Sequence, residues 1–293
     1  MNRQDAKDAK IRKREIKELK CGAVPIVGRM AIFAFISLFL ILASLASWRF
    51  ILENAPSMIS LVVPVYNEAD NIQLFLRDVE SAVGEPHEIL IVFDFPEDNT
   101  LPAVAALTPP CPSVRLVHNT LGRGVLNALK AGFQASKGDV ILVMMADRSD
   151  DPHSVVPMAR LVREGADVVA GSRYVRGGRQ EGGPLVKRTL SRLAGMSLYY
   201  LAGLPIHDAT NNFRAYSRRV IEQIPIEGEA SFAVALELTL KAHWRGWRLA
   251  EVPTVWRDRT AGQSRFRLWA WMPHYLRWYL RALRRAWFGA SKT

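Results

Sequence analysis

Acidic side chains follow several of the short apolar runs that read as strands. Glu68 and Asp94 each come soon after such a run, and an acidic cluster at 147–151 follows another. Carboxylate oxygens in this pattern suit a nucleotide bound with a divalent cation, because hard oxygen ligands hold Mg²⁺ or Mn²⁺ while phosphate oxygens fill the other positions. The alternative is that each acid caps the helix that follows it.

Basic side chains gather further along the chain. Arg173 ends another apolar run, and Lys187, Arg188 and Arg192 follow the glycine-rich stretch 177–183. The last three lie near the start of a predicted helix that continues through Leu201, and a helix N-terminus with nearby cations favours an anion. Sequence alone leaves open a second reading, in which they form the positive edge of a membrane-facing helix.

Apolar runs and helical stretches alternate from Met58 onward, and these elements must position the polar residues. Helices are predicted near 69–83, 122–136 and 151–163. This alternation is typical of an α/β fold with a mostly parallel, doubly wound sheet, which binds ligands beyond the carboxyl ends of its strands. The predicted strands are ISLVVPVY, HEILIVFD, VRLVHN, DVILVMMAD and ADVVAGSR.

Composition narrows the class of protein. The 293 residues are 49% hydrophobic and 23% charged, which suits a globular chain with a full core. The two cysteines, Cys21 and Cys111, are too few for a disulfide scaffold or a cysteine-rich zinc site. The net charge is +11, but most of it lies in residues 1–29 and 256–293, so the body is near neutral. Basic ends of this kind favour an anionic membrane surface over nucleic acid as the partner.

The N-terminal part predicts a membrane attachment. Residues 1–29 form a basic tail, and Met30–Trp48 is a run without charges, so 30–50 is predicted as a membrane helix. An interfacial helix or a buried core helix remains the alternative. The lysines and arginines before the run would keep the N-terminus in the cytoplasm and place the residues after the run outside. This orientation conflicts with a nucleotide-binding domain, because its nucleotide ligand would come from the cytoplasm.

The C-terminal part, 266–293, reads as a basic amphipathic helix. Apolar and aromatic residues recur at helical spacing, and four arginines cluster elsewhere on the helix. We expect this helix to lie on an anionic membrane surface. The other interpretation is a helix that docks on the domain and keeps a solvated arginine face.

An ordered series of motifs resembles one known family. PVYNEADNI at 64–72, the strand ending in Asp94, the stretch 122–152, GSRYVRGG at 171–178, DATNNFRAY at 208–216 and DRTAGQSRF at 258–266 resemble family 2 glycosyltransferases. The likeness is greatest to the dolichyl- or polyprenyl-phosphate mannose synthase-like branch. It implies a GT-A fold for the domain at 58–265.

On the donor side, the resemblance assigns roles to single residues. Asp94 is expected to face the base. Met145-Ala146-Asp147 stands where the family has D-x-D, so only Asp147 is retained as a ligand of Mg²⁺ or Mn²⁺ and of the diphosphate. Ser149 is a further expected ligand, and either Glu97 or Asp98 is a candidate for the second acid. The nucleotide pocket is expected to be lined by Pro64, Tyr66 and Glu68.

On the phosphate and acceptor side, the resemblance implies cations. Arg173, Arg259 and Arg265 match positions that hold the donor diphosphate or the acceptor phosphate, and Arg259 and Arg265 are expected to act in catalysis together with Asp147. Lys187, Arg188 and Arg192 match the region that holds the acceptor phosphate. Asp208 and Glu237 match positions on the acceptor side, and Arg214 is a further expected substrate-binding residue.

The implied activity is transfer of one sugar, with inversion, from a UDP- or GDP-sugar to a polyprenyl phosphate at the membrane. A phosphate monoester is already anionic at neutral pH, so this acceptor needs no general base. The alternatives are a glycolipid or saccharide acceptor, and a catalytically silent homologue that binds nucleotide or lipid.

Overall fold

The computed structural model describes residues 57–228, 233–258 and 268–289. The chain divides into two units, Met1–Pro56 and Ser57–Thr293. The basic tail at 1–29 and the predicted membrane helix at 30–50 therefore lie outside the described residues. Within the described ranges, no helix has the length and apolar character needed to cross a membrane.

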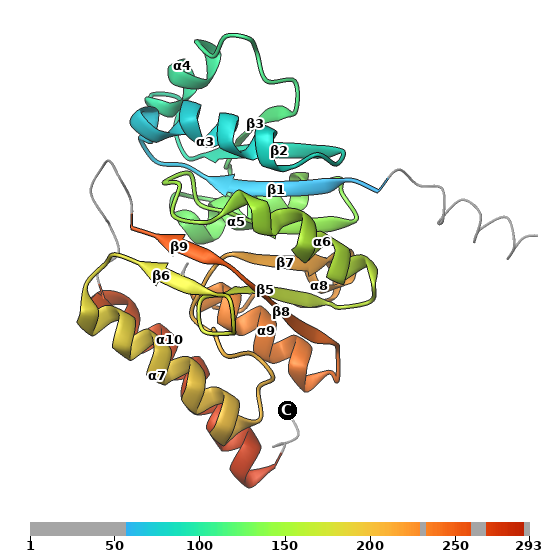
Figure 1. Ribbon diagram of the computed structural model, residues 1–293, viewed down its shortest axis with the longest axis vertical. Helices are drawn as coiled ribbons and strands as arrows, with labels where there is room; N and C mark the ends of the chain where they lie inside the picture. Colours follow the sequence, from blue (N-terminus) through green and yellow to red (C-terminus); the bar gives the residue numbers. More distant parts are fainter. Residues whose placement is uncertain (1–56, 229–232, 259–267, 290–293) are drawn as a thin grey trace, which may run out of the picture. The chain divides into compact units, whose positions relative to one another are not determined.

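A seven-stranded sheet forms the centre of the second unit (Figure 1). Its strand order is β3-β2-β1-β4-β7-β5-β8, and every neighbouring pair is parallel except those that involve β7. The predicted mostly parallel sheet is therefore confirmed. The strands are β1 Ile59–Pro64, β2 His87–Phe93, β3 Val114–His118, β4 Val140–Val143, β5 Val168–Ser172, β7 Arg214–Ser217 and β8 Leu249–Pro253.

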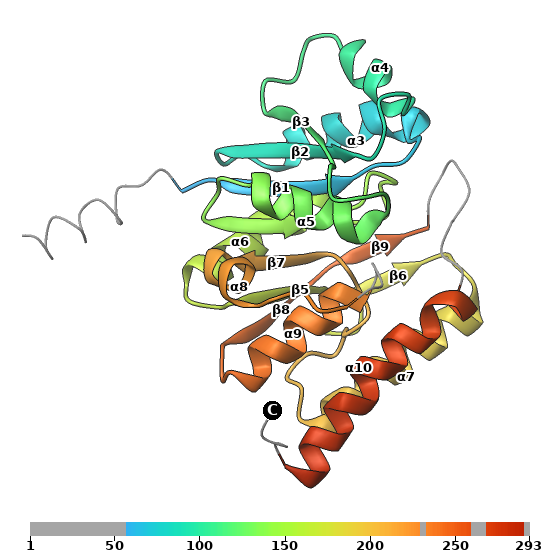
Figure 2. The same cartoon turned by 180° about the vertical axis from the view of Figure 1, so that it is seen from behind.

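Helices cover both faces of this sheet because the central strands are apolar on both sides. Leu61 and Val63 of β1 pack with α3 (Ala69–Ala82) and α6 (Val155–Arg163), which lie in front in Figure 1. Val62 points to the other face and packs with that face's helices, which are in front in Figure 2. These are α5 (Val125–Ala135), α8 (Arg218–Gln223) and α9 (Val234–Trp244). Two short helical segments, α4 (Thr100–Ala105) and η1 (Pro152–Ser154), complete this part of the chain.

A small two-stranded ribbon lies beyond the main sheet. β6 (Arg179–Glu181) pairs in parallel with β9 (Val255–Arg257). The Thr254 N–H donates to the Ser172 carbonyl at 3.0 Å, and the Arg257 N–H donates to the Ser149 carbonyl at 2.9 Å. These bonds fix the ribbon to the end of β5 and to the turn after β4, at the edge where ligands of such sheets bind.

Two long helices, α7 (Leu185–Ala202) and α10 (Leu268–Phe288), run side by side in both views (Figures 1 and 2). The Tyr279 hydroxyl donates to Ser197 Oγ at 2.9 Å, and the Trp287 indole donates to the Leu201 carbonyl at 3.0 Å. Trp278 is buried in a cluster with residues of α9. The C-terminal helix thus packs on the domain along one side, and the expected contact of this helix with a membrane surface stays a prediction.

Candidate active site

The carboxyl ends of the parallel strands open onto a cavity of about 2440 Å³. It is larger than the roughly 300–1,000 Å³ typical of a pocket for one small ligand, so it has room for two substrates. Its wall contains many of the side chains proposed from the sequence: Pro64, Tyr66, Glu68, Asp94, Asp147, Ser149, Arg173, Lys187 and Arg188. Arg192, Asp208 and Arg214 are not among the lining residues, and Arg259 and Arg265 lie outside the described residues.

The loop after β1 is held by the fully buried carboxylate of Asp98. Both of its oxygens accept the Asn67 N–H at 3.1 Å, and one also accepts the Thr100 N–H at 2.8 Å. Asn67 has φ +55°, a left-handed conformation that few residue types adopt. Asp98 therefore holds the backbone beside Tyr66 and does not line the pocket, which differs from the suggestion that it supplies a second metal-binding acid.

Asp94 ties the end of β2 to the start of α5. Its carboxylate accepts the Asn119 side-chain amide at 2.7 Å and the Gly124 N–H at 2.8 Å. Gly124 has φ +115°, where a side chain would strain the backbone, so glycine suits this helix start. The acid at the predicted base-binding position is thus fixed by two hydrogen bonds at the pocket wall.

A tight turn after β4 carries the acidic cluster. Asp147 accepts the Ser149 N–H at 3.1 Å, and Asp150 accepts the Met145 N–H at 3.3 Å. All four residues line the pocket, and both carboxylates are nearly buried. Burial, and then the charge of Asp147, raise the pKa of Asp150 to about 7. From the sequence, Asp150 is only one member of the acidic cluster at 147–151. Its raised pKa comes from burial, which the sequence does not reveal.

This raised pKa makes stability depend on pH. An aspartate in the unfolded chain titrates near pH 3.8, so between about pH 4 and pH 7 the folded state holds a proton that the unfolded chain has lost. The free energy of unfolding therefore falls as pH rises through this window. We expect Asp150→Asn to raise the free energy of unfolding at pH 8 by up to roughly 4 kcal/mol, and by less at pH 5. Urea denaturation at both pH values measures this, and an equal gain at both would contradict the assignment.

The donor set of the turn fits a divalent cation. Asp147, Ser149 and Asp150 offer hard oxygen atoms on one side of the pocket, and Mg²⁺ is usually held by one or two carboxylates together with substrate phosphates. Within residues 57–228, 233–258 and 268–289, no three His, Cys, Asp or Glu side chains group as a metal site.

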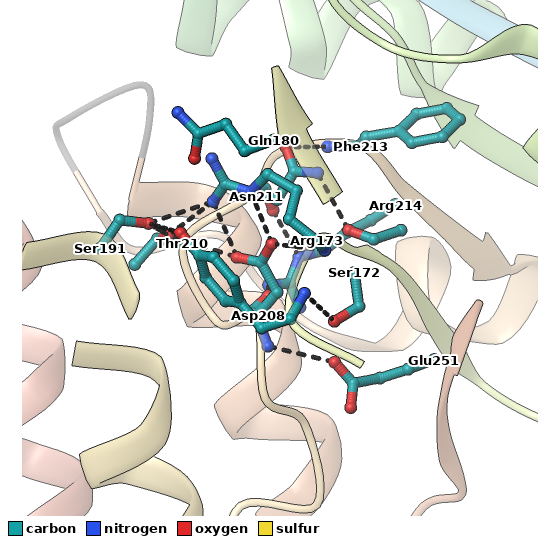
Figure 3. Close-up of polar contacts among 12 residues, drawn as sticks. Ser172, Arg173, Gln180, Ser191, Asp208, Thr210, Asn211, Phe213, Arg214 and Glu251 are labelled. Atoms are coloured by element: carbon teal, nitrogen blue, oxygen red, sulfur yellow. Dashed lines mark hydrogen bonds and ion pairs between the residues drawn. The ribbon is translucent and has the colours of Figure 1, made fainter. Parts of the chain in front are cut away.

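Arg173 also lines the pocket and lies in a network of polar contacts (Figure 3). Asp208 accepts its Nε at 2.7 Å and one terminal nitrogen at 2.9 Å, and the same nitrogen donates to Ser191 and Thr210 at 3.1 Å. Burial lowers the pKa of the guanidinium, but the charge and hydrogen bonds of Asp208 outweigh it and raise the pKa. Among the described residues, no side-chain hydrogen bond involves the other terminal nitrogen, Nη1.

Asp208 and Arg214 stand behind this wall. Both side chains are fully buried, and the Arg214 guanidinium donates to the carbonyls of Asn211 and Asp208 and to Thr239 Oγ1. Burial raises the pKa of the Asp208 carboxyl, but the charge of Arg173 outweighs this and lowers it. The expected contact of Asp208 and Arg214 with substrate thus differs from the structure, in which both residues support Arg173 and its loop.

Several lining residues escaped sequence reasoning. Gln180, Asn212, Trp256 and Tyr275 all face the pocket, from β6, the loop before β7, β9 and α10. Asn212 lies inside the DATNNFRAY motif, and this motif is the one sequence feature that could have marked Asn212 as a pocket residue. Gln180 and Trp256 sit on three-residue strands, too short to show a periodic pattern.

The fold and this pocket define a glycosyltransferase of the GT-A type. The chain belongs to glycosyl transferase family 2, whose profile matches residues 60–225. The chain is 35% identical over 212 residues to a polyprenol monophosphomannose synthase of Mycolicibacterium smegmatis, covering 70% of this chain and 79% of that protein. It is 30% identical to an undecaprenyl-phosphate mannosyltransferase of Micrococcus luteus, covering 70% and 85%.

Two further similarities extend this result. A dolichol-phosphate mannosyltransferase of Pyrococcus furiosus is 28% identical over 71% of this chain, and the match spans only 59% of that longer protein. Among solved structures, glucosyl-3-phosphoglycerate synthase of Mycobacterium tuberculosis, in complex with Mn²⁺, UDP and product, has a TM-score of 0.58. It shares 19% identity and covers 79% of this chain and 80% of its own. The similarity to this solved structure establishes the fold.

Proposed function

We propose that the protein transfers one sugar from a nucleoside diphosphate sugar to a polyprenyl phosphate at a membrane surface, with inversion at the anomeric carbon. The observation that carries this proposal is the continuity of the pocket. One cavity runs from the acidic strand ends at Asp94 and Asp147 to a basic and apolar wall on α7 and α10. The three relatives are named as transferases or synthases that act on polyprenyl, undecaprenyl or dolichyl phosphates, which supports the choice of acceptor.

The donor would occupy the acidic part of the pocket. Tyr66, Glu68 and Asp94 lie after β1 and β2 and would contact the base and ribose, while Asp147 lies after β4 and would face the diphosphate. A divalent cation held by Asp147 would supply positive charge to the departing diphosphate. Mn²⁺ in the similar synthase makes Mn²⁺ a reasonable first choice, with Mg²⁺ as the alternative.

The acceptor would occupy the wall formed by α7 and α10. Lys187 and Arg188 stand at the start of α7, and the pocket continues past Leu193 on α7 and Met272 and Leu276 on α10. Cations at a helix start favour a phosphate, and the apolar residues beyond favour a prenyl chain.

The chemistry follows from these positions. An oxygen of the acceptor phosphate forms a bond to the anomeric carbon, and the bond from that carbon to the diphosphate oxygen breaks, with both electrons leaving on the diphosphate. A single displacement of this kind inverts the configuration. Arg173 lines the same pocket as Asp147 and would help to neutralise the negative charge that gathers on the departing diphosphate, and Arg259 and Arg265 remain expected contributors.

Product analysis tests the proposal. The full-length protein is incubated with undecaprenyl phosphate, Mn²⁺, and either GDP-mannose or UDP-glucose, and the lipid extract is examined by mass spectrometry. We expect an acid-labile polyprenyl monophosphate sugar. A labelled glycolipid or saccharide formed from a membrane extract would favour the alternative acceptor, and no transfer with specific nucleotide binding would favour a silent homologue.

The exposed faces of α7 and α10 support a membrane-surface location. Exposed arginines lie on the same two helices as the exposed apolar side chains, and this combination suits an anionic membrane leaflet. We expect the domain to act on the cytoplasmic face of the membrane. The exposed apolar side chains are Leu185, Val186, Leu190, Leu193, Tyr200, Leu201, Leu276, Leu280, Trp287 and Phe288.

A surface substitution tests this location. Leu185 and Val186 are 73% and 70% exposed and do not line the pocket. Burying such a side chain in a bilayer contributes about 1.5 kcal/mol or more, so we expect Leu185→Glu with Val186→Glu to raise KM for vesicle-embedded acceptor at least ~10-fold. The KM for the soluble donor should not change. Leu74→Glu, at an exposed leucine of α3, is the control, and an equal effect of both variants would contradict the location.

A further inference from the structure

We propose that Gln180 and Asn212 form a hydroxyl-binding site that selects the transferred sugar. This inference rests on the proposed function and deepens it by assigning the sugar-binding part of the pocket. Two side-chain amide oxygens, Gln180 Oε1 and Asn212 Oδ1, are buried and have no hydrogen-bond partner among the described residues. Both residues line the cavity that contains Asp147 and Arg173.

Gln180 is held on the β6–β9 ribbon. It pairs with Trp256 in the register of the two strands, and both side chains face the pocket. Its Nε2 donates to the Gly182 carbonyl at 3.5 Å, which orients the amide and leaves Oε1 unsatisfied. Exchanging the two amide atoms would bring oxygen toward oxygen at Gly182, so the unsatisfied atom is the acceptor. Figure 3 includes Gln180 and Arg173 in one close-up and draws no contact from Gln180 to the other residues shown.

Asn212 is presented by a rigid loop. The neighbouring Asn211 donates from Nδ2 to the Gly171 carbonyl at 2.9 Å and accepts the Phe213 N–H at 3.4 Å. The Gly171 N–H donates to the Phe213 carbonyl at 2.9 Å, and Arg173 binds Thr210. Thr210, Asn211 and Phe213 are therefore all hydrogen-bonded to β5 or to the residue after it. The Asn212 side-chain oxygen has no hydrogen-bond partner among the described residues.

The chemistry of these atoms indicates their ligand. A buried acceptor without a partner is costly, and a ligand that donates a hydrogen bond removes that cost. Ionised phosphate oxygens carry no proton, so a diphosphate or acceptor phosphate at this place would leave the two amide oxygens unpaired. Sugar hydroxyl groups donate, and an aromatic ring such as Trp256 offers an apolar surface beside them.

The strand order agrees with this assignment. The proposed base and ribose contacts follow β2 and β1, and Asp147 follows β4. Gln180 and Asn212 lie on segments that follow β5 and precede β7, on the other side of β4. A nucleotide sugar laid across this edge with its diphosphate at Asp147 would thus place its sugar against the two amides, next to the acceptor cations on α7.

Matched binding measurements test the inference. Calorimetry compares GDP with GDP-mannose, and UDP with UDP-glucose, on the full-length wild type, Gln180→Leu and Asn212→Leu, each with Mn²⁺. We expect each substitution to weaken binding of the preferred nucleotide sugar by roughly 10-fold or more and to leave binding of the matching free diphosphate unchanged. Gln134→Leu, at an exposed glutamine of α5 outside the pocket, is the control.

Deoxy-sugar nucleotides complete the test. Removing the hydroxyl that an amide binds should weaken binding to the wild type, and should have little effect on the variant that lacks the amide. If the wild type binds and transfers sugar but both leucine variants retain wild-type selectivity among these donors, the inference is overturned while the proposed function stands. If no nucleotide or nucleotide sugar binds to the folded wild type, the proposed function fails first.

Discussion

The Asp147→Asn variant is expected to keep its fold and to lose sugar transfer by about 10²–10³-fold in kcat/KM, the usual cost of removing a group that stabilises charge in the transition state. Asparagine has the same shape and still accepts the Ser149 N–H through its oxygen, so the turn after β4 should survive. What disappears is the one carboxylate retained at the D-x-D position. The concentration of Mn²⁺ that gives half-maximal activity should also rise.

Steady-state kinetics and a Mn²⁺ titration measure both effects. Asp151→Asn is the matched control, because Asp151 caps η1 by accepting the His153 N–H and does not line the large pocket. A loss in Asp151→Asn equal to that in Asp147→Asn would show that the cluster acts as a whole. Full activity in Asp147→Asn would remove Asp147 from the proposed mechanism.

The second large effect is expected at Asp208. Asp208→Ala leaves the Arg173 guanidinium buried without its carboxylate, and breaking a buried pair in this way costs about 3–5 kcal/mol of folding free energy. Transfer should fall by about 10²-fold or more, because Arg173 loses the two bonds that aim it at the pocket. Asp208→Asn keeps one acceptor oxygen and should lie between alanine and wild type in both measurements.

Thermal denaturation and kinetics test this prediction. Glu164→Ala breaks an exposed ion pair with Arg160, so it should change stability by less than about 1 kcal/mol and leave activity unchanged. If Asp208→Ala were no less stable than Glu164→Ala, the Arg173–Asp208 pair would not support the fold as described. A stable but inactive Asp208→Asn would separate the positioning of Arg173 from its contribution to folding.

The first half of the domain could be predicted because most of its strands are buried on both faces. The buried strands β1, β2, β4 and β5 form continuous apolar runs in the sequence, and β3, which is only partly buried, was recognisable as a shorter apolar run. The antiparallel strand β7 was not predicted, since its four residues include the buried Arg214 and resemble a loop motif. The short strands β6 and β9 carry no pattern that separates them from turns.

The candidate site was predictable only in part, for a related reason. Residues that follow parallel strands, such as Asp94 and Asp147, could be expected at one sheet edge. Sequence does not reveal burial, so Asp208 and Arg214 could not be distinguished from side chains that touch a ligand. The unsatisfied oxygens of Gln180 and Asn212 arise from tertiary packing, which no local pattern records.

The reversed direction of β7 has a consequence for how donor preference could diversify. A strand that runs opposite to its neighbours starts at the edge where they finish, which is why the loop at 208–213 reaches the pocket at all. Under the proposed assignments, nucleotide choice is encoded in residues 64–94 and sugar choice in residues 180–212. Either preference could then change by substitution in one stretch of the gene while the other is inherited intact.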